Sequence, residues 1–151
     1  MFYGEYEHTI DDKCRLIIPA KIRSPFRDVL IDQFVLNRGF EGCLVLYPPN
    51  EWHEIEQKYR HYSTNKADVR NYLRMFFSGA TIVECDKQGR ITIPKKLLEY
   101  AGIEKEVTLI GVSTKVELWA KEKWNQEFSR TIDSFSEIAE KIGDLDLKGN
   151  L

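Results

Sequence analysis

The chain has 151 residues, of which 42% are hydrophobic and 30% are charged, and its formal net charge is −2. This length allows burial of roughly 70% of the unfolded surface, which predicts a compact fold, and the slightly acidic balance excludes a uniformly basic nucleic-acid binder. No apolar run approaches the ~20 residues of a membrane span, and Met1–Glu5 does not resemble a signal peptide. We therefore expect a cytoplasmic protein whose three cysteines are reduced.

The first half of the chain predicts strands and helices in a defined order. A strand leads into a turn from Asp11 to Arg15, and a second strand leaves it. Pro19 then suits the first turn of a short helix, because its missing N–H would be unpaired there. A hairpin and two amphipathic helices follow. The expected positions are strands at 7–10 and 16–18, a helix at 20–30 interrupted at Pro25, a hairpin at 34–37 and 43–47 around Gly39 and Gly42, and helical stripes at Trp52, Ile55, Tyr59, Tyr62 and at Val69, Leu73, Phe76.

The second half predicts the same order of elements. Pro94 again precedes a short helix, which Gly102 ends. Residues 143–151 lack a periodic pattern, and we expect them to fray. The expected positions are strands at 80–85 and 90–93, a helix at 95–101, a hairpin at 107–111 and 116–120 with Gly111 in its turn, and a final helical stripe at Trp124, Phe128, Phe135, Ile138 and Ile142.

The strongest signal is an internal repeat. Residues 11–19 (DDKCRLIIP) return 75 positions later as residues 86–94 (DKQGRITIP), and further matches follow at an offset of 72. One copy alone would leave sheet edges open, whereas two copies can pair their hairpins. We therefore expect an α+β fold with a pseudo-two-fold, β-barrel-like core and peripheral helices. Its halves are residues 1–76 and 77–151, intertwined in one barrel.

Basic charge is concentrated on both copies of the repeated segment. Residues 13–27 contain five basic and no acidic side chains, and residues 87–98 contain four basic and no acidic ones. The chain from Glu117 onward is acidic in balance. This distribution predicts two local cationic surfaces on a protein of nearly neutral charge.

The aspartate and arginine of each copy suit a braced cationic turn. Asp11 can accept N–H groups two residues on and hold Arg15 in a bidentate pair, and Asp86 can do the same for Arg90. An arginine held in this way matches the O6 and N7 atoms of guanine in the major groove. The neighbouring lysines could contact phosphates, which supply affinity without sequence information. These lysines are Lys13, Lys21, Lys87, Lys95 and Lys96.

The alternative interpretation is that both pairs are structural ion pairs that only staple their turns. A single Asp-x-x-x-Arg pattern is common and weak evidence of function. Two copies at matched positions, each opening an acid-free basic segment, strengthen the functional interpretation. The residues alone leave both interpretations open.

The pattern Gly4…Asp11-x-x-x-Arg15-x-x-x-Pro19, repeated from Gly79 to Pro94, resembles the MraZ family over nearly the whole chain. Further residues that carry the resemblance are Leu44-Val45-Leu46-Tyr47-Pro48 before Trp52, and Val116-Glu117-Leu118-Trp119 before Trp124. The resemblance implies an AbrB/MazE-like swapped-hairpin barrel. It also implies a bacterial DNA-binding transcription factor, a nucleoid-associated repressor of the division and cell-wall gene cluster. Ring-shaped homo-oligomers that bind short direct repeats in double-stranded promoter DNA are implied as well.

The family's motif arginine falls on Arg15 and Arg90, and its motif aspartate on Asp11 and Asp86. One departure is Cys14, where the second copy has Gly89. Glycine adopts a left-handed backbone conformation freely, whereas cysteine does so at a cost. We therefore expect the two turns to differ in shape.

Other functional classes have less support. A MazE-type antitoxin module is the main alternative, although few residues follow Ile142 to form a wrapping tail. We expect no enzyme, cofactor, metal site or small-molecule substrate: His53-Glu54 lacks the second histidine of a zinc motif, and no nucleophile–base pair is evident. The aromatic stripes are expected to be core, with a subunit interface as the alternative for the last helix.

Overall fold

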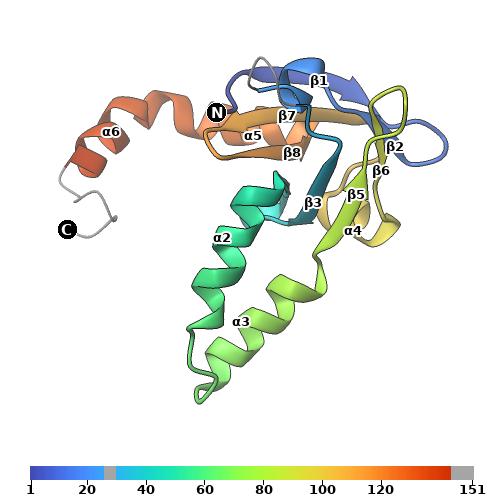
Figure 1. The fold of residues 1–151 in the computed structure, drawn as a ribbon. Coiled ribbons are helices and arrows are strands. Elements are labelled where there is room, and N and C mark those ends of the chain that lie inside the picture. Colours follow the sequence, from blue (N-terminus) through green and yellow to red (C-terminus); the bar gives the residue numbers. More distant parts are fainter. Residues whose placement is uncertain (26–29, 144–151) are drawn as a thin grey trace. The chain divides into compact units, whose positions relative to one another are not determined.

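The two repeats share one antiparallel sheet. In the computed structural model, which describes residues 1–25 and 30–143, six strands lie in the order β1-β7-β8-β4-β3-β5, and β2 and β6 form a separate ladder (Figure 1). The counterparts in the two repeats are β1 and β5, β3 and β7, and β4 and β8. Replacing each strand by its counterpart gives the same order read from the opposite edge of the sheet. The bounds are β1 Glu5–Thr9, β2 Arg15–Ile17, β3 Gln33–Arg38, β4 Leu44–Tyr47, β5 Thr81–Glu84, β6 Arg90–Thr92, β7 Glu106–Val112 and β8 Lys115–Ala120.

Strands of the first repeat pair with strands of the second at both edges and in the centre of the large sheet, whereas β3–β4 and β7–β8 pair within one repeat. β1 pairs with β7, with Tyr6 opposite Leu109. β5 pairs in the same way with β3, the counterpart of β7. In the centre, β4 pairs with β8, with Leu44 opposite Leu118. Neither repeat therefore completes its hydrogen-bond ladders without the other.

The core of unit 1, which comprises Met1–Lys121, draws on both sheets and on two short helices. Leu16 of β2 and Ile91 of β6 are completely buried, as are Phe34 and Leu109 of the large sheet. The helices are α1 Ala20–Arg23 and α4 Lys95–Ala101, and they contribute Ile22 and Leu97 among others. Both helices follow a proline, as the sequence predicts, and Gly102 ends α4 with a φ of 65°. The α1 helix ends before Pro25, and residues 26–29 of its expected range lie outside the described residues.

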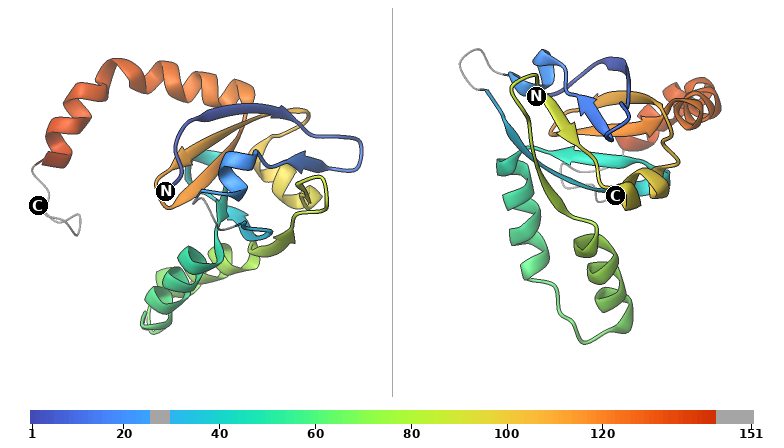
Figure 2. Two further views of the ribbon diagram at one scale, coloured as in Figure 1. Left: turned by 45° about the horizontal axis from the view of Figure 1, so that its top comes forward. Right: turned by 90° about the vertical axis from the view of Figure 1, so that its right-hand side faces the viewer.

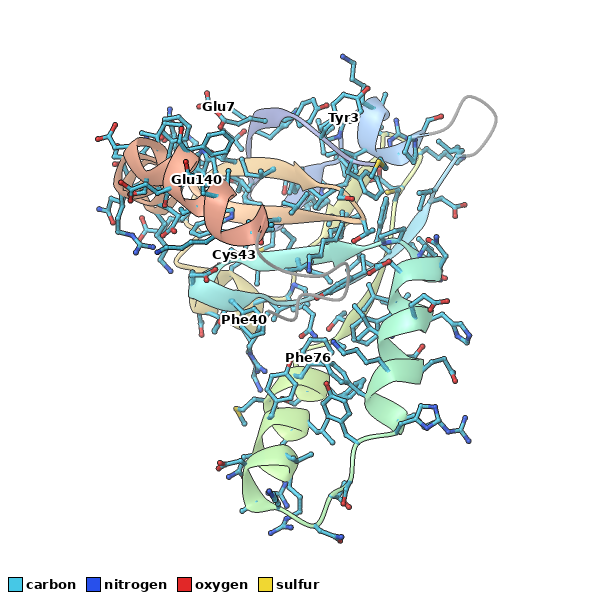
Figure 3. The ribbon with its side chains drawn as sticks, turned by 90° about the vertical axis from the view of Figure 1, so that its left-hand side faces the viewer. Tyr3, Glu7, Phe40, Cys43, Phe76 and Glu140 are labelled. Carbon is cyan, nitrogen blue, oxygen red and sulfur yellow. The ribbon has the colours of Figure 1, made fainter. Side chains whose placement is uncertain are left out.

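A helical hairpin extends from the sheet between β4 and β5. It consists of α2 Pro49–Arg60 and α3 Ala67–Ser78, which lie side by side in both views of Figure 2. Their predicted stripes face each other: Trp52 stacks on Phe76, which is labelled in Figure 3, with ring centroids 5.6 Å apart. The hydroxyls of Tyr59 and Tyr72 lie 2.7 Å apart. The expectation that these stripes are core is wrong, because no residue of either helix is buried. The aromatic rings pack mainly on one another.

Unit 2, Glu122–Leu151, carries the last helices. In place of one helical stripe, α5 Lys121–Thr131 and α6 Phe135–Gly143 are joined by the 3₁₀ turn η2 Ile132–Ser134. None of the apolar side chains of this stripe is buried: Trp124 is half-buried, and the others are exposed rather than core, with Phe135 at 67% and Ile142 at 60% exposure. The expected frayed segment lies outside the described residues apart from Gly143, which ends α6.

The two hairpins of the repeats differ in their turns. In the first, Gly39 precedes the 3₁₀ turn η1 Phe40–Gly42, as expected. In the second, the prediction that Gly111 lies in the turn is wrong, because Gly111 is inside β7 and Ser113 takes the positive φ of 64°. Glycine is needed at this strand position for a steric reason: a Cβ on Gly111 would lie 2.3 Å from the backbone nitrogen of Tyr3, in the segment that pairs antiparallel beside the end of β7.

The predicted α+β class is confirmed, since an antiparallel sheet and helices make up the described chain. The swapped-hairpin barrel with halves 1–76 and 77–151 stays a prediction. Within the described ranges, no helix has both the length and the apolar character needed to cross a bilayer.

Candidate nucleic-acid interface

Turn 1, residues 11–15, is built around the carboxylate of Asp11. Its Oδ1 accepts the N–H groups of Lys13 and Arg15, each at 2.9 Å, and its Oδ2 accepts Arg15 Nε at 2.7 Å. The backbone adds Asp11 N–H to the Arg15 carbonyl and Cys14 N–H to the Asp11 carbonyl, both at 3.0 Å. One aspartate therefore closes the turn and orients the arginine.

Turn 2, residues 86–90, repeats this geometry. Asp86 Oδ1 accepts the N–H groups of Gln88 and Arg90 at 2.9 Å, and Oδ2 accepts Arg90 Nε at 2.8 Å. The expected ion pairs are therefore present, but the expected bidentate form is wrong. Each guanidinium uses only Nε, because the second carboxylate oxygen is occupied by backbone amides. In the described part of the chain, Nε makes the one recorded polar contact of each guanidinium, which leaves the other donors for a ligand.

The expected difference in turn shape is also wrong. Cys14 has a φ of 61° and Gly89 a φ of 80°, so both residues take the left-handed conformation that the turn requires. Cysteine adopts it in spite of its Cβ, which costs about 1–2 kcal/mol relative to glycine. The surrounding hydrogen bonds determine the turn, and the departure at Cys14 affects strain rather than shape.

The short antiparallel ladder of β2 and β6 joins the two turns, with turn 1 at one of its ends and turn 2 at the other. Arg15 lies opposite Thr92, and Arg90 lies opposite Ile17. Two further bonds continue the ladder symmetrically: Ile18 N–H to the Gly89 carbonyl and Ile93 N–H to the Cys14 carbonyl, both 2.8 Å. The turns lie at the same end of unit 1, away from the hairpin of α2 and α3 (Figures 1 and 2).

Strand alternation places both arginines on the outer face of this ladder. Leu16 and Ile91 point into the core, so the residues flanking them point outward. The side chains of Arg15 and Arg90 are 28% and 26% exposed, and neither is sealed from solvent. Ile17, between them, is 48% exposed. The outer face of the ladder, Arg15, Ile17, Arg90 and Thr92, is here called the ribbon face.

The other candidate residues lie around the ribbon face. The predicted lysines Lys13, Lys21, Lys87, Lys95 and Lys96 are all exposed. Lys13 and Lys87 belong to the turns, and Lys21 and Lys96 occupy equivalent places near the starts of α1 and α4. Sequence reasoning missed Ile17 and Thr92 as surface residues. The polar Thr92 at the equivalent position of the second copy is the signal that could have identified Ile17 as a surface residue.

Hydrogen bonding keeps both motif aspartates ionised. The Arg15 N–H bond, followed by the bonds of the Arg15 side chain and the Lys13 N–H, lowers the pKa of Asp11 below its ordinary value. The Arg90 N–H and its side chain lower the pKa of Asp86 in the same way. Each brace therefore remains charged at neutral pH. Among the described residues, no three His, Cys, Asp or Glu side chains gather into a group that could hold a metal ion.

Comparisons with known proteins place the chain. The family model described as "MraZ protein, putative antitoxin-like" matches twice, over residues 1–75 and 76–145. A relative named "Transcriptional regulator MraZ" from Desulforamulus reducens is 48% identical over 96% of this chain and 99% of its own length. Relatives of the same name from Moorella thermoacetica and Pelotomaculum thermopropionicum are 49% and 50% identical over 97% of this chain and 100% and 99% of their own lengths. The chain therefore belongs to the MraZ family.

Proposed function

We propose that the protein is a sequence-specific regulator of transcription that binds double-stranded DNA through the ribbon face. The observation that carries the proposal is the pair of identically braced arginines, Arg15 and Arg90, on one face of a two-stranded ladder. The major groove, about 12 Å wide, admits a two-stranded β-ribbon. The three similar relatives are all named transcriptional regulators, which supports the same function.

The ribbon face and the charged residues around it have separate roles in this proposal. The free guanidinium donors of Arg15 and Arg90 read guanine O6 and N7, while Asp11 and Asp86 hold them in place. Ile17 offers an apolar contact to a thymine methyl group. The exposed lysines Lys13, Lys21, Lys87 and Lys96 contact phosphates on either side of the groove.

The fold proposed for this function is an AbrB/MazE-like swapped-hairpin barrel with halves 1–76 and 77–151. Support comes from the exchange of β1 and β5 between the repeats. This exchange brings turns that are 75 residues apart in sequence onto one ladder. A single repeat would present one arginine, whereas Arg15 and Arg90 together can contact bases on both DNA strands of one site.

Assembly into a ring-shaped homo-oligomer completes the proposal. A protomer with a net charge of −2 and one small cationic face binds DNA weakly. Linking several such faces raises avidity by about 10²–10⁴ without new contacts, and spaced faces match direct repeats in a promoter. We propose that the protein acts in the cytoplasm on the nucleoid, as a repressor of the bacterial division and cell-wall gene cluster.

The test compares Arg15→Ala, Arg90→Ala and the double variant with wild type in gel-shift titrations. The probe is the duplex upstream of the protein's own coding region, and a scrambled duplex of equal length measures non-specific binding. Loss of one arginine–guanine contact corresponds to about 5- to 150-fold in discrimination. Unchanged discrimination in a folded double variant, as judged by circular dichroism, would contradict the proposal.

A further inference from the structure

Turn 2 has an arginine of the other repeat as a close neighbour. Arg23, at the end of α1 in the first repeat, lies over Gly89 of the second repeat, so that a Cβ on Gly89 would be 2.8 Å from Arg23 Cζ and 2.9 Å from Nε. Arg23 Nε also donates to the Ile18 carbonyl at 3.2 Å. Ile18 in turn donates its N–H to the Gly89 carbonyl. The guanidinium is thus anchored to Ile18, the residue whose N–H bonds to turn 2, and rests on the backbone next to Arg90.

The charge of Arg23 acts on the same region. Burial raises the pKa of the Cys85 thiol, and the positive charge of Arg23 partly offsets this increase, whereas Asp32 and Asp86 add to it. Cys85 directly precedes Asp86 in the chain. Arg23 therefore lies over Gly89 within turn 2, and its charge also acts on Cys85, the residue before the turn.

Turn 1 is supported by different chemistry. The residue 75 positions after Arg23 is Leu98, which is buried in the core. The residue that corresponds to Gly89 is Cys14, whose side chain packs against that core. The two turns are therefore held in place by different contacts. At turn 2 an arginine lies over a glycine, and at turn 1 a cysteine packs against apolar side chains.

We infer that Arg23 is a positioning residue for DNA binding, which braces turn 2 and thereby Arg90 from the opposite repeat. This inference rests on the proposed function. The two turns then have the same internal hydrogen bonds, but different neighbouring residues hold each of them in position for binding. Arg23 should be energetically coupled to Arg90 and independent of Arg15.

A double-mutant cycle on DNA affinity tests this coupling. Arg23→Leu is combined with Arg90→Ala in one cycle and with Arg15→Ala in another, at one fixed salt concentration with the upstream duplex. Interacting residues typically couple by about two- to hundredfold in an equilibrium constant. We expect the Arg23–Arg90 double variant to lose at least about twofold less affinity than the product of the single losses. The Arg23–Arg15 double variant should lose the full product, whereas general weakening of the fold would give the same result in both cycles.

A compensating pair gives an independent test. Gly89→Cys forces the Arg23 guanidinium away, because the new Cβ would overlap it. Gly89→Cys combined with Arg23→Leu reproduces the cysteine and leucine found at turn 1, so the double variant should bind DNA no more weakly than Gly89→Cys alone. Arg23→Lys keeps the charge but loses the flat guanidinium, and we expect it to restore only part of the affinity lost in Arg23→Leu.

Arg60→Leu is the matched control, since Arg60 is an exposed arginine of α2 in the hairpin that lies away from the turns. It should change affinity less than Arg23→Leu, with melting curves checking that all variants fold. Equal coupling of Arg23 to Arg15 and Arg90, or equal losses in the Arg23 and Arg60 variants, would overturn the inference. Wild-type protein that binds no DNA would instead refute the proposed function itself.

Discussion

The brace between aspartate and arginine can be removed without removing the turn. Asp11→Asn keeps an oxygen that can accept the Lys13 and Arg15 N–H groups, but it replaces the charged acceptor of Arg15 Nε with an amide. The fold and the turn should therefore remain. The arginine loses its fixed orientation, and its discrimination between DNA sequences should fall.

The size of the effect follows from the order that the brace imposes. The Nε–Oδ2 contact of 2.7 Å holds Arg15 in one orientation before DNA arrives. Without it, binding must order a free arginine, whose rotamer entropy corresponds to about 10- to 30-fold in an equilibrium constant. The ratio of specific to scrambled-duplex affinity should fall by about this factor per altered site. Non-specific binding should rise slightly, because one negative charge is lost.

Asp12→Asn is the matched control for this experiment. Asp12 is exposed, lies in the same turn and undergoes the same charge change, and no polar contact of its side chain is recorded within the described residues. Fluorescence anisotropy with labelled specific and scrambled duplexes gives both affinities at one salt concentration. Equal loss of discrimination in Asp11→Asn and Asp12→Asn would refute the orienting role, since charge alone would then explain the result.

Two other predictions concern stability. Gly111→Ala places a Cβ against the backbone of the segment that pairs beside the end of β7, where the Phe2–Ser113 bridge and the bond from the Gly111 N–H to the Gly4 carbonyl form. Loss of these backbone bonds should lower the free energy of unfolding by about 2–4 kcal/mol in urea titrations. The control is Gly143→Ala, which should have little effect because nothing lies within 4 Å of the added Cβ. Similar losses in both variants would contradict the steric argument. The pKa values of Asp11 and Asp86 are lowered in the folded state, so their contribution to stability is present above the ordinary value of 3.8 and is lost as pH falls through the lower folded values. Urea titrations between pH 7 and pH 3 should show this acid-side loss in wild type and a smaller one in a variant with both aspartates changed to asparagine; identical profiles would argue against it.

The sequence alone determines the local features of the site. The hydrogen bonds of turns 1 and 2 join residues no more than four positions apart, so the pattern of aspartate, arginine and proline is enough to predict them. The helix from Lys95 to Ala101 is predicted correctly for the same reason, since its proline start and glycine end are local signals. The repeat adds that every such feature occurs twice.

Tertiary structure decides which of these features meet. The pairing of β2 with β6 joins Arg15 to Thr92 across the fold, and no local signal shows that both arginines share one face with Ile17. The contact of Arg23 with Gly89 likewise exists only after α1 has packed across the repeat. Backbone bonds within a turn depend on a few adjacent residues, whereas pairing between distant strands depends on which surfaces the whole chain can bury together.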